Sequence, residues 1–214
     1  MSADAYLVPA RASTAETEVT RSRFLATVER VGDEDAARAV VEGLRRAHHD
    51  ARHHCSAWVL GPDRAIERSH DDGEPAGTAG APILEVVRGS GLSDVVVVVT
   101  RWFGGTLLGA GGLVRAYGDA ARAGLDAAGS RRRLRLTELT LTLPHADAGR
   151  VEASLRDAGV AVLDVAWAEA VTLRLGVRPD AVHDLHARVA TLTGGSASAD
   201  PAGSSWVDAP ATAG

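Results

Sequence analysis

Five consecutive valines at positions 95–99 most restrict how this chain can fold, because they form the centre of its most apolar run. Residues 94–101 predict a β-strand with apolar side chains on both faces, and such a strand has to be covered on both sides. The segment TRWFGGTLLGAGGLVR at 100–115 follows and is rich in glycine. Glycine at this density costs backbone entropy without adding side-chain contacts. The segment is therefore either a tight turn with close packing or a loop whose backbone approaches a ligand.

Around this strand, the first 130 residues alternate between strand and helix patterns. Asp33 offers an N-cap to an amphipathic helix, and Gly129 is a candidate C-terminal cap of another. Residues 69–82 have the composition of a loop. Elements are expected at 16–31 (a strand or hairpin), 33–47 (a helix), 53–60 and 65–68 (strands), 83–87 (a short helix, or a strand) and 113–128 (a helix).

Beyond an arginine run at 131–135 the pattern changes. Strand, helix, strand, strand and helix patterns follow at 134–143, 145–158, 160–167, 170–177 and 179–192. This order needs one more strand to complete a split βαβ sandwich, and residues 203–208 are the candidate. The tail from Gly194 is rich in Ala, Ser, Gly and Pro and is expected to be partly disordered. The prediction is an α+β protein with an N-terminal extension at 1–15, domains at 16–130 and 134–208, and a disordered tail at 209–214.

Charge and composition exclude several classes of protein. The formal net charge is −5, and residues 1–130 hold 14 arginines against 18 acids while residues 131–214 hold 9 against 10. Neither half therefore binds nucleic acid by bulk electrostatics, and DNA is not an expected partner. The single cysteine, Cys55, fits a reducing compartment. Neither a signal peptide nor a membrane-length apolar run is recognisable, so a cytoplasmic protein without a membrane partner is expected.

The acidic loop HDDGEP at 70–75 is the first candidate for chemistry. Its carboxylates, Asp71, Asp72 and Glu74, could hold a divalent cation or orient a water molecule. Their spacing does not match a calcium-binding loop. The alternative is a turn in which the aspartates bond their own backbone. No metal site is predicted here.

A histidine cluster is the second candidate. It contains His48, His49, His53 and His54, next to Cys55. One cysteine and no matched ligand pairs make a weak zinc site. On a strand, His53 shares a face with Cys55 and the small apolar residues after it, so it is expected at the edge of the core as a partly buried, hydrogen-bonded side chain.

The glycine segment itself is the third candidate. Between a buried strand and a helix it can direct backbone N–H groups at an anion, with Arg101 and Arg115 adding charge. Its spacing matches neither a P-loop nor a dinucleotide-binding loop. Structural turn, ligand contact and RNA contact stay open. The arginine run at 131–135 is either a solvated linker or a contact to RNA or an acidic partner.

Four segments together resemble the IMPACT/YigZ family, namely RSRFLATV, HDARHHCSAWVLG, DDGEPAGTAGAPIL and VVVVVTRWFGGTLLGAGGLVRAY. They have the family's order and spacing over residues 18–128, and the remaining pattern resembles the second domain of its bacterial YigZ branch. The resemblance implies a first domain with the β-α fold also seen in a small-subunit ribosomal protein and in domain IV of the translocation factor. It implies a ferredoxin-like second domain. The RWD domain of the eukaryotic branch is not expected, since only about 15 residues precede the family core.

The resemblance also implies a link to translation. The leading interpretation is a non-enzymatic regulator that binds the ribosome or a translation factor. An RNA-binding protein and an enzyme acting on a small phosphorylated ligand are the alternatives. The family supplies no catalytic residues, and no cofactor is expected. The candidate binding surface comprises His48, His53, Asp71, Asp72, Glu74, Arg101, Gly104, Gly105, Gly109, Gly111, Gly112 and Arg115.

Overall fold

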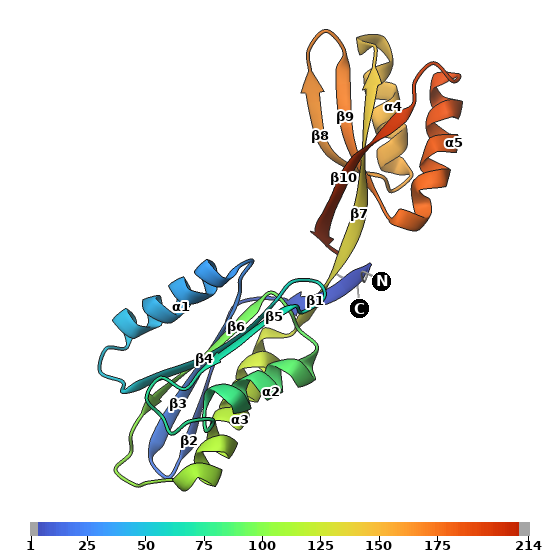
Figure 1. The fold of residues 1–214 in the computed structure, drawn as a ribbon. Coiled ribbons are helices and arrows are strands. Elements are labelled where there is room, and N and C mark those ends of the chain that lie inside the picture. The colour runs from blue at the N-terminus through green and yellow to red at the C-terminus, as the bar shows by residue number, and fades with distance from the viewer. Residues whose placement is uncertain (1–3, 210–214) are drawn as a thin grey trace. The chain divides into compact units, whose positions relative to one another are not determined.

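The computed structural model describes residues 4–209, which divide into two compact units at Arg132 and Arg133. Both units mix helices and strands (Figure 1), so the predicted α+β class is confirmed. The strand β7 (Ser130–Leu143) begins at the end of the first unit and continues into the second.

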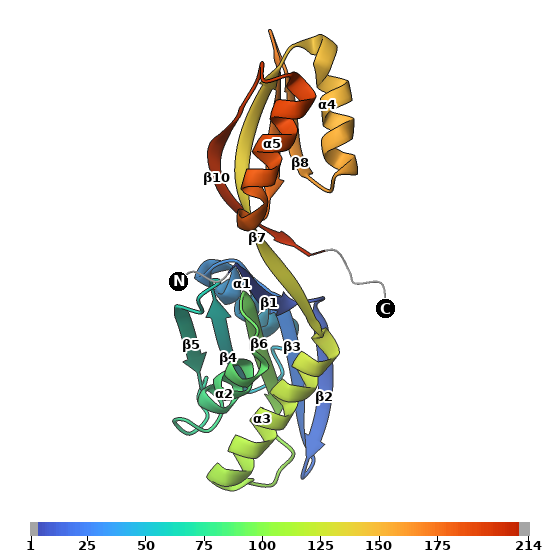
Figure 2. The same cartoon turned by 90° about the vertical axis from the view of Figure 1, so that its right-hand side faces the viewer.

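The first unit is built on an antiparallel sheet with the strand order β2-β3-β6-β4-β5. The valine-rich strand β6 is its central strand. Figures 1 and 2 show two helices side by side on one face of this sheet and a third helix on the opposite face. The elements of the unit that precede β7 are β1 (Ala5–Pro9), β2 (Ser13–Val19), β3 (Ser22–Arg30), α1 (Glu34–Ala47), β4 (His53–Leu60), β5 (Ile66–His70), α2 (Gly80–Ser90), β6 (Val95–Trp102) and α3 (Gly109–Ala128).

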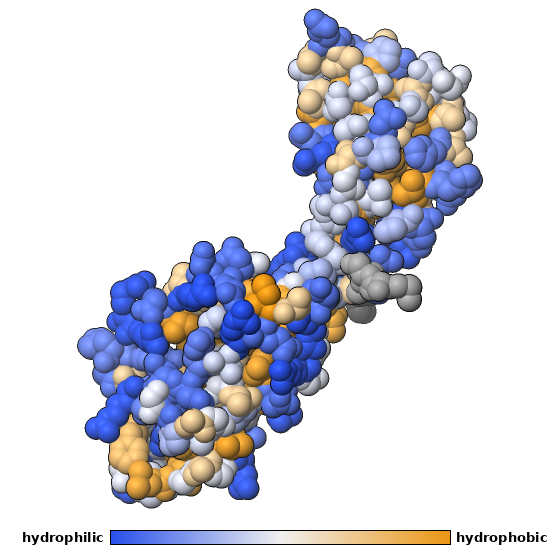
Figure 3. All heavy atoms as spheres, viewed as in Figure 1, coloured by the Kyte–Doolittle hydropathy of each residue, from blue (hydrophilic) through white to orange (hydrophobic). Residues whose placement is uncertain are grey.

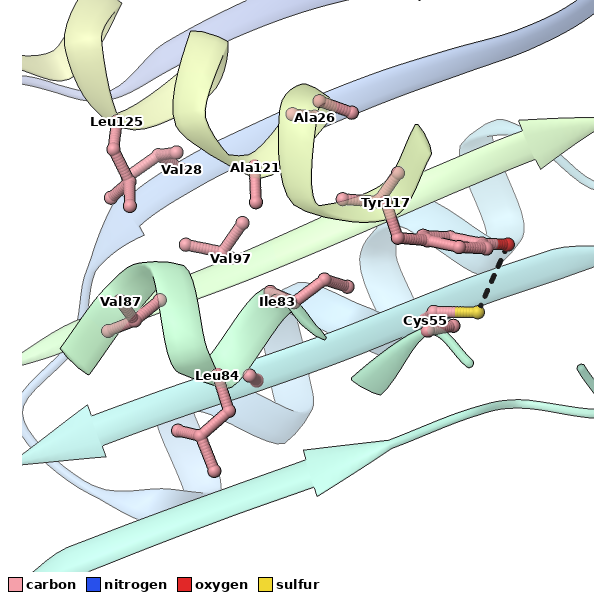
Figure 4. Close-up of a cluster of buried hydrophobic side chains, with 14 of the residues drawn as sticks. Ala26, Val28, Cys55, Ile83, Leu84, Val87, Val97, Tyr117, Ala121 and Leu125 are labelled. Carbon is pink, nitrogen blue, oxygen red and sulfur yellow. Dashed lines mark hydrogen bonds between the residues drawn. The ribbon is translucent and has the colours of Figure 1, made fainter. Parts of the chain in front are cut away.

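The valines of β6 are covered on both faces, as their sequence requires. Val95, Val97 and Val99 are fully buried in one core with α2 and α3. Val96 and Val98 are fully buried in a second core beneath α1. Figure 4 shows side chains of α2 and α3 over the first of these faces. The predicted double burial is confirmed, in an antiparallel sheet that helices cover on both sides.

Local signals fix several element ends. Asp33 is the N-cap of α1, and its side chain accepts a hydrogen bond from the backbone N–H of Ala36 at 2.7 Å. Helix α3 ends at Gly129, which has a positive φ of 62°, a conformation that favours glycine. Both caps were predicted from the sequence. Helix α2 is longer than the short helix expected at 83–87, and the strand alternative for that segment was wrong.

Residues 1–15, expected to be an extension before the first domain, contribute strands. They hold β1 and the first residues of β2, whose Ser13 and Ala15 pair with Val28 and Ala26 of β3. The first three residues of β2 (13–15) show no apolar alternation that predicts a strand, so pairing with β3 determines their conformation.

The second unit confirms the ferredoxin-like prediction. After β7 it contains α4 (His145–Asp157), β8 (Ala161–Trp167), β9 (Val171–Val177), α5 (Val182–Thr193) and β10 (Ala199–Asp208). The strand order β10-β7-β9-β8 is antiparallel throughout. Leucines on the inner face of the sheet pack against Val151 and Leu155 of α4 and Leu185 of α5. This β-α-β-β-α-β arrangement is the split βαβ sandwich.

The prediction of a last strand at 203–208 is confirmed, and the partial disorder expected from Gly194 onward was wrong for residues 199–208. These residues form β10, which pairs with β7 from Ala199 to Asp208 with one irregularity between Pro201 and Gly203. Small and polar residues dominate the strand, so composition alone favoured disorder, whereas hydrogen bonding to the edge of β7 orders it. Of the tail expected at 209–214, residues 210–214 lie outside the described part of the chain.

Replacing Ile83 by alanine tests the core of the first unit. Ile83 is fully buried between α2 and the sheet, so Ile83→Ala is expected to lower the free energy of unfolding by about 2–5 kcal/mol through lost burial and a residual cavity. Urea denaturation measures this change. The matched variant Ile66→Ala, at a side chain that is 38% exposed, is expected to cost below about 1 kcal/mol. Equal losses for the two variants contradict the assigned core.

Candidate functional site

A cavity of about 380 Å³ lies in the first unit, where the acidic loop and the glycine segment face each other. Residues of both loops line it, together with β4 and the first turn of α3. The residues that matter below are His53, Glu74, Arg101, Phe103, Leu107 and Gly109. Two of the four segments that carry the family resemblance, the acidic loop and the glycine segment, therefore meet at one hollow.

A buried ion pair lies in the wall of this cavity. Glu74 Oε1 and Arg101 Nη1 are 2.5 Å apart, and the two side chains are only 4% and 6% exposed. The hydroxyl of Tyr117 donates to the same Glu74 oxygen at 2.7 Å. Arg101 also donates to Ser22 Oγ over a long 3.4 Å, and its Nε is buried without a partner among the described residues. The pair joins the acidic loop to strand β6 and helix α3.

His53 is the second polar group of the cavity. Its Nδ1 lies 2.9 Å from the backbone carbonyl oxygen of Asp72. A carbonyl oxygen only accepts hydrogen bonds, so Nδ1 carries the proton, and in the neutral ring Nε2 offers a lone pair. Nε2 lies 3.9 Å from Glu74 Oε1. The expectation of a partly buried, hydrogen-bonded His53 at the core edge is confirmed.

The two aspartates of the acidic loop use their carboxylates within the fold. Asp71 accepts hydrogen bonds from the backbone N–H groups of Gly77, Ala79 and Gly80 at the start of α2. Burial raises its pKa, but these three donors outweigh burial and bring the pKa below its usual range. Asp72 pairs with Arg45 of α1 and accepts from the backbone N–H of His54 at 2.6 Å. The turn predicted as an alternative therefore describes Asp71, which bonds backbone N–H groups of the same loop and of the helix after it. Asp72 bonds α1 and β4 instead, and Glu74 faces the cavity.

The glycines of the segment have different surroundings. A Cβ at Gly104 would lie 2.1 Å from the carbonyl carbon of Arg21, so only glycine fits this close approach. Gly105 and Gly109 have positive φ angles of 87° and 69°. Gly111 and Gly112 belong to the first turn of α3, and of the two only Gly112 would bring a Cβ near a neighbour, Leu108. Gly109 lies at the cavity.

His48 and Arg115 lie outside the described cavity lining. His48 packs edge-on against the ring of Trp102, with 5.3 Å between ring centroids. Arg115 is exposed on α3 and borders a different hollow, between α2 and α3. The arginine run at 131–135 lies in strand β7, where Arg133 and Arg135 pair in register with Asp208 and Trp206 of β10.

Five residues used to describe the site were not among the candidates from the sequence: Ser22, Arg52, Phe103, Leu107 and Tyr117. Tyr117 fits the apolar pattern of a helix, and that pattern does not predict which group its hydroxyl contacts. Ser22 follows the hairpin turn without any local signal. Leu107 is 87% exposed, and the Leu107-Leu108 pair in a glycine-rich segment does not reveal which of the two stays in water.

Cys55 is not available as a nucleophile. It is fully buried, and its Sγ donates to the carbonyl oxygen of Asp71. Burial raises the pKa of the thiol far above its ordinary value, so the reactive thiolate does not form at neutral pH. Burial raises the pKa of Tyr117 in the same way. Among residues 4–209 no group of three or more metal-binding side chains comes together, and none of the described helices is both long and apolar enough to cross a membrane.

The chain has two consecutive α+β units, the first with this cavity and the second ferredoxin-like. Comparison with known proteins identifies this two-domain architecture. A family model for the Impact N-terminal domain matches residues 20–125, and one for a domain of unknown function (DUF1949) matches residues 141–196. The chain is 38% identical to the IMPACT family member YigZ of Escherichia coli (strain K12) over 90% of its own length and 96% of that protein. It belongs to the IMPACT family.

Two further similarities agree with this assignment. The IMPACT family member YvyE of Bacillus subtilis (strain 168) is 34% identical over 89% of this chain and 88% of that protein. A crystal structure described as that of a hypothetical protein is 37% identical, covers 92% of this chain and 97% of its own, and has a TM-score of 0.69. The family resemblance drawn from the sequence motifs is confirmed.

Removing one partner of the buried ion pair is expected to be costly. Glu74→Leu leaves Arg101 as an uncompensated buried charge, so the free energy of unfolding should fall by about 3–5 kcal/mol. The double variant Glu74→Leu with Arg101→Met removes both charges and should lose less than Glu74→Leu alone. Urea denaturation of both variants measures the difference. Asp180→Ala, which breaks the exposed pair with Arg178, is the control and should cost below about 1 kcal/mol. A double variant less stable than Glu74→Leu contradicts this account.

His54 is expected to make stability depend on pH. It is buried beside α1, and burial lowers its pKa below the ordinary value. The unfolded chain therefore binds the proton first, at about pH 6.5, and the free energy of unfolding falls as the pH drops below that value. Chemical denaturation at pH 7.5, 6.5 and 5.5 should show this slope. His54→Gln should flatten it, whereas His49→Gln at an exposed position should not. An unchanged slope in the His54 variant overturns the assignment.

Proposed function

We propose that the protein is a non-enzymatic, translation-associated binding protein that contacts the ribosome or a translation factor through the cavity surface of its first unit. The observation that carries the proposal is the apolar rim of the cavity, formed by Phe103 and Leu107. These side chains are 41% and 87% exposed, next to the buried charges of Glu74 and Arg101. Figure 3 shows apolar surface at the end of the first unit where the connection between β6 and α3 lies.

Exposed apolar side chains beside a hollow are typical of interaction sites. A rim leucine with most of its surface in water gains free energy when a partner covers it. The hot spots of interfaces combine such apolar anchors with arginine and aromatic residues, as Arg52, Arg101 and Phe103 do here. The family resemblance supports translation as the setting in which this surface works. The free, buried Cys55 fits the cytoplasm as the compartment.

The enzyme alternative has less support. It used Asp71, Asp72 or Glu74 as a base or metal ligand, and the first two carboxylates are held by backbone N–H groups and Arg45. Glu74 is held by Arg101 and Tyr117.

RNA binding through the glycine segment, its arginines and the run at 131–135 also has less support. Arg101 is buried against Glu74, and Arg115 borders a different hollow from the cavity. In the arginine run, Arg133 and Arg135 lie in a strand that pairs with β10, and both halves of the chain carry more acids than arginines.

Leu107→Asp tests the proposed surface. Wild-type protein is expected to co-sediment with ribosomes or with one translation factor in a manner that resists salt, because apolar contact carries the binding. Placing a charge at an anchor should cost about 2 kcal/mol or more, which weakens binding about 25-fold. Val114→Asp, at a side chain of α3 that is 42% exposed and outside the cavity lining, should bind like the wild type. Wild-type protein that stays in the post-ribosomal fraction and captures no translation factor overturns the proposal, as does full binding by Leu107→Asp.

A further inference from the structure

The start of helix α3 presents unused hydrogen-bond donors at the cavity. Its N-cap, Leu108, has no side-chain acceptor, and its first turn contains no acidic residue. Helices α1 and α2 differ, because Asp33 and Asp71 bond the N–H groups at their starts. The first N–H groups of a long helix carry a partial positive charge and attract anions. Gly109 and Ala110 belong to this first turn, and both line the cavity.

Arg101 is an independent indication of a missing acceptor in the same cavity. It is 5% exposed and lines the wall. A guanidinium group has five N–H donors, yet this one meets a single Glu74 oxygen and, at 3.4 Å, Ser22 Oγ. Its Nε has no partner among the described residues. A buried cation with so few acceptors gains from a further oxygen ligand.

Arg52 adds positive charge at the opening. It is exposed, and its guanidinium lies 5.9 Å from the centre of the Phe103 ring. Within the described chain no carboxylate pairs with it. Glu74 already neutralises Arg101, so Arg52 leaves a net charge of about +1 at the cavity. One carboxylate would neutralise that charge, whereas a phosphate dianion would leave an excess negative charge near Glu74.

The remaining walls are apolar. Pro75, Phe103, Leu107 and Leu113 contribute to the lining, and the volume of about 380 Å³ accommodates a group of the size of one or two residues. A ligand that fills this space has an anionic end near the start of α3 and an apolar body against Phe103 and Leu107.

We propose that the cavity binds a carboxylate attached to an apolar group, with the carboxylate at the first turn of α3 between Arg52 and Arg101. This inference rests on the proposed function, because it names the chemistry that the same surface accepts. The carboxylate belongs either to a polypeptide chain that ends in an apolar residue or to a free small molecule, and the recognition chemistry is shared.

The test follows the backbone N–H resonances of Gly109, Gly111 and Gly112 in the ¹⁵N-labelled full chain. N-acetyl-leucine is expected to shift them saturably, whereas N-acetyl-leucinamide, which lacks the charge, should not. Arg52→Ala should weaken the binding about tenfold through loss of a charged hydrogen-bond partner. Arg115→Ala, an exposed arginine on the same helix but outside the cavity lining, should leave it unchanged.

Two further probes separate the sources and the alternatives. A tripeptide ending in leucine that binds more tightly than N-acetyl-leucine assigns a polypeptide end, and equal binding assigns a small carboxylate; both support the proposal. Equal shifts with the amide, tighter binding of inorganic phosphate, or no shift with any probe overturns it. If no carboxylate binds but Leu107→Asp still abolishes co-sedimentation, this inference fails and the proposed function stands. If carboxylates bind but no translation partner is found, the proposed function fails and this inference stands.

Discussion

The buried ion pair between Glu74 and Arg101 is the interaction on which the rest of the first unit's site depends. It joins three segments that are distant in the sequence, because Arg101 lies near the end of the central strand, Glu74 lies in the acidic loop, and Tyr117 of α3 donates to the same carboxylate oxygen. In a poorly solvated wall neither charge is tolerated without the other. The acidic loop therefore has to lie against β6 and α3, and the cavity exists only in that arrangement.

The other acids of the loop make this position possible. Asp71 fixes the start of α2 and Asp72 binds Arg45 and the backbone of β4, so the loop is held at both ends while Glu74 reaches inward. Asp72 and Gly73 adopt positive φ angles of 46° and 85° in the turn. The three carboxylates of the loop therefore have different roles: Asp71 and Asp72 accept hydrogen bonds from the backbone, and Glu74 forms the buried ion pair. Three carboxylates within four positions of a sequence do not by themselves indicate a cation site.

Much of the fold could be predicted because its signals are local. The apolar strand at 94–101, the Asp33 cap and the β-α-β-β-α order each follow from a few neighbouring residues. Strand β10 could be predicted only at 203–208, where the β-α-β-β-α order needs a last strand. Its first residues, 199–202, have a composition typical of disorder, and pairing with β7 overrides it. The roles within the site depend on contacts across 27 or more positions, as between Glu74 and Arg101 or Tyr117. No spacing rule tells which of three acids turns inward, or that Leu107 stays in water.

The glycine segment contains the close packing that was one of the explanations its sequence left open. Gly104 is a packing residue, since its missing Cβ lets the chain pass against the backbone at Arg21 and Ser22. That close approach fixes the path of the chain from Arg101 toward α3, while Ser22 Oγ accepts from both the Gly104 N–H and Arg101. Gly109 then lets α3 begin with its N–H groups at the cavity instead of against a side chain. Tight packing at one end of the segment therefore positions an open helix start at the other, and a residue with a Cβ at Gly104 would displace both.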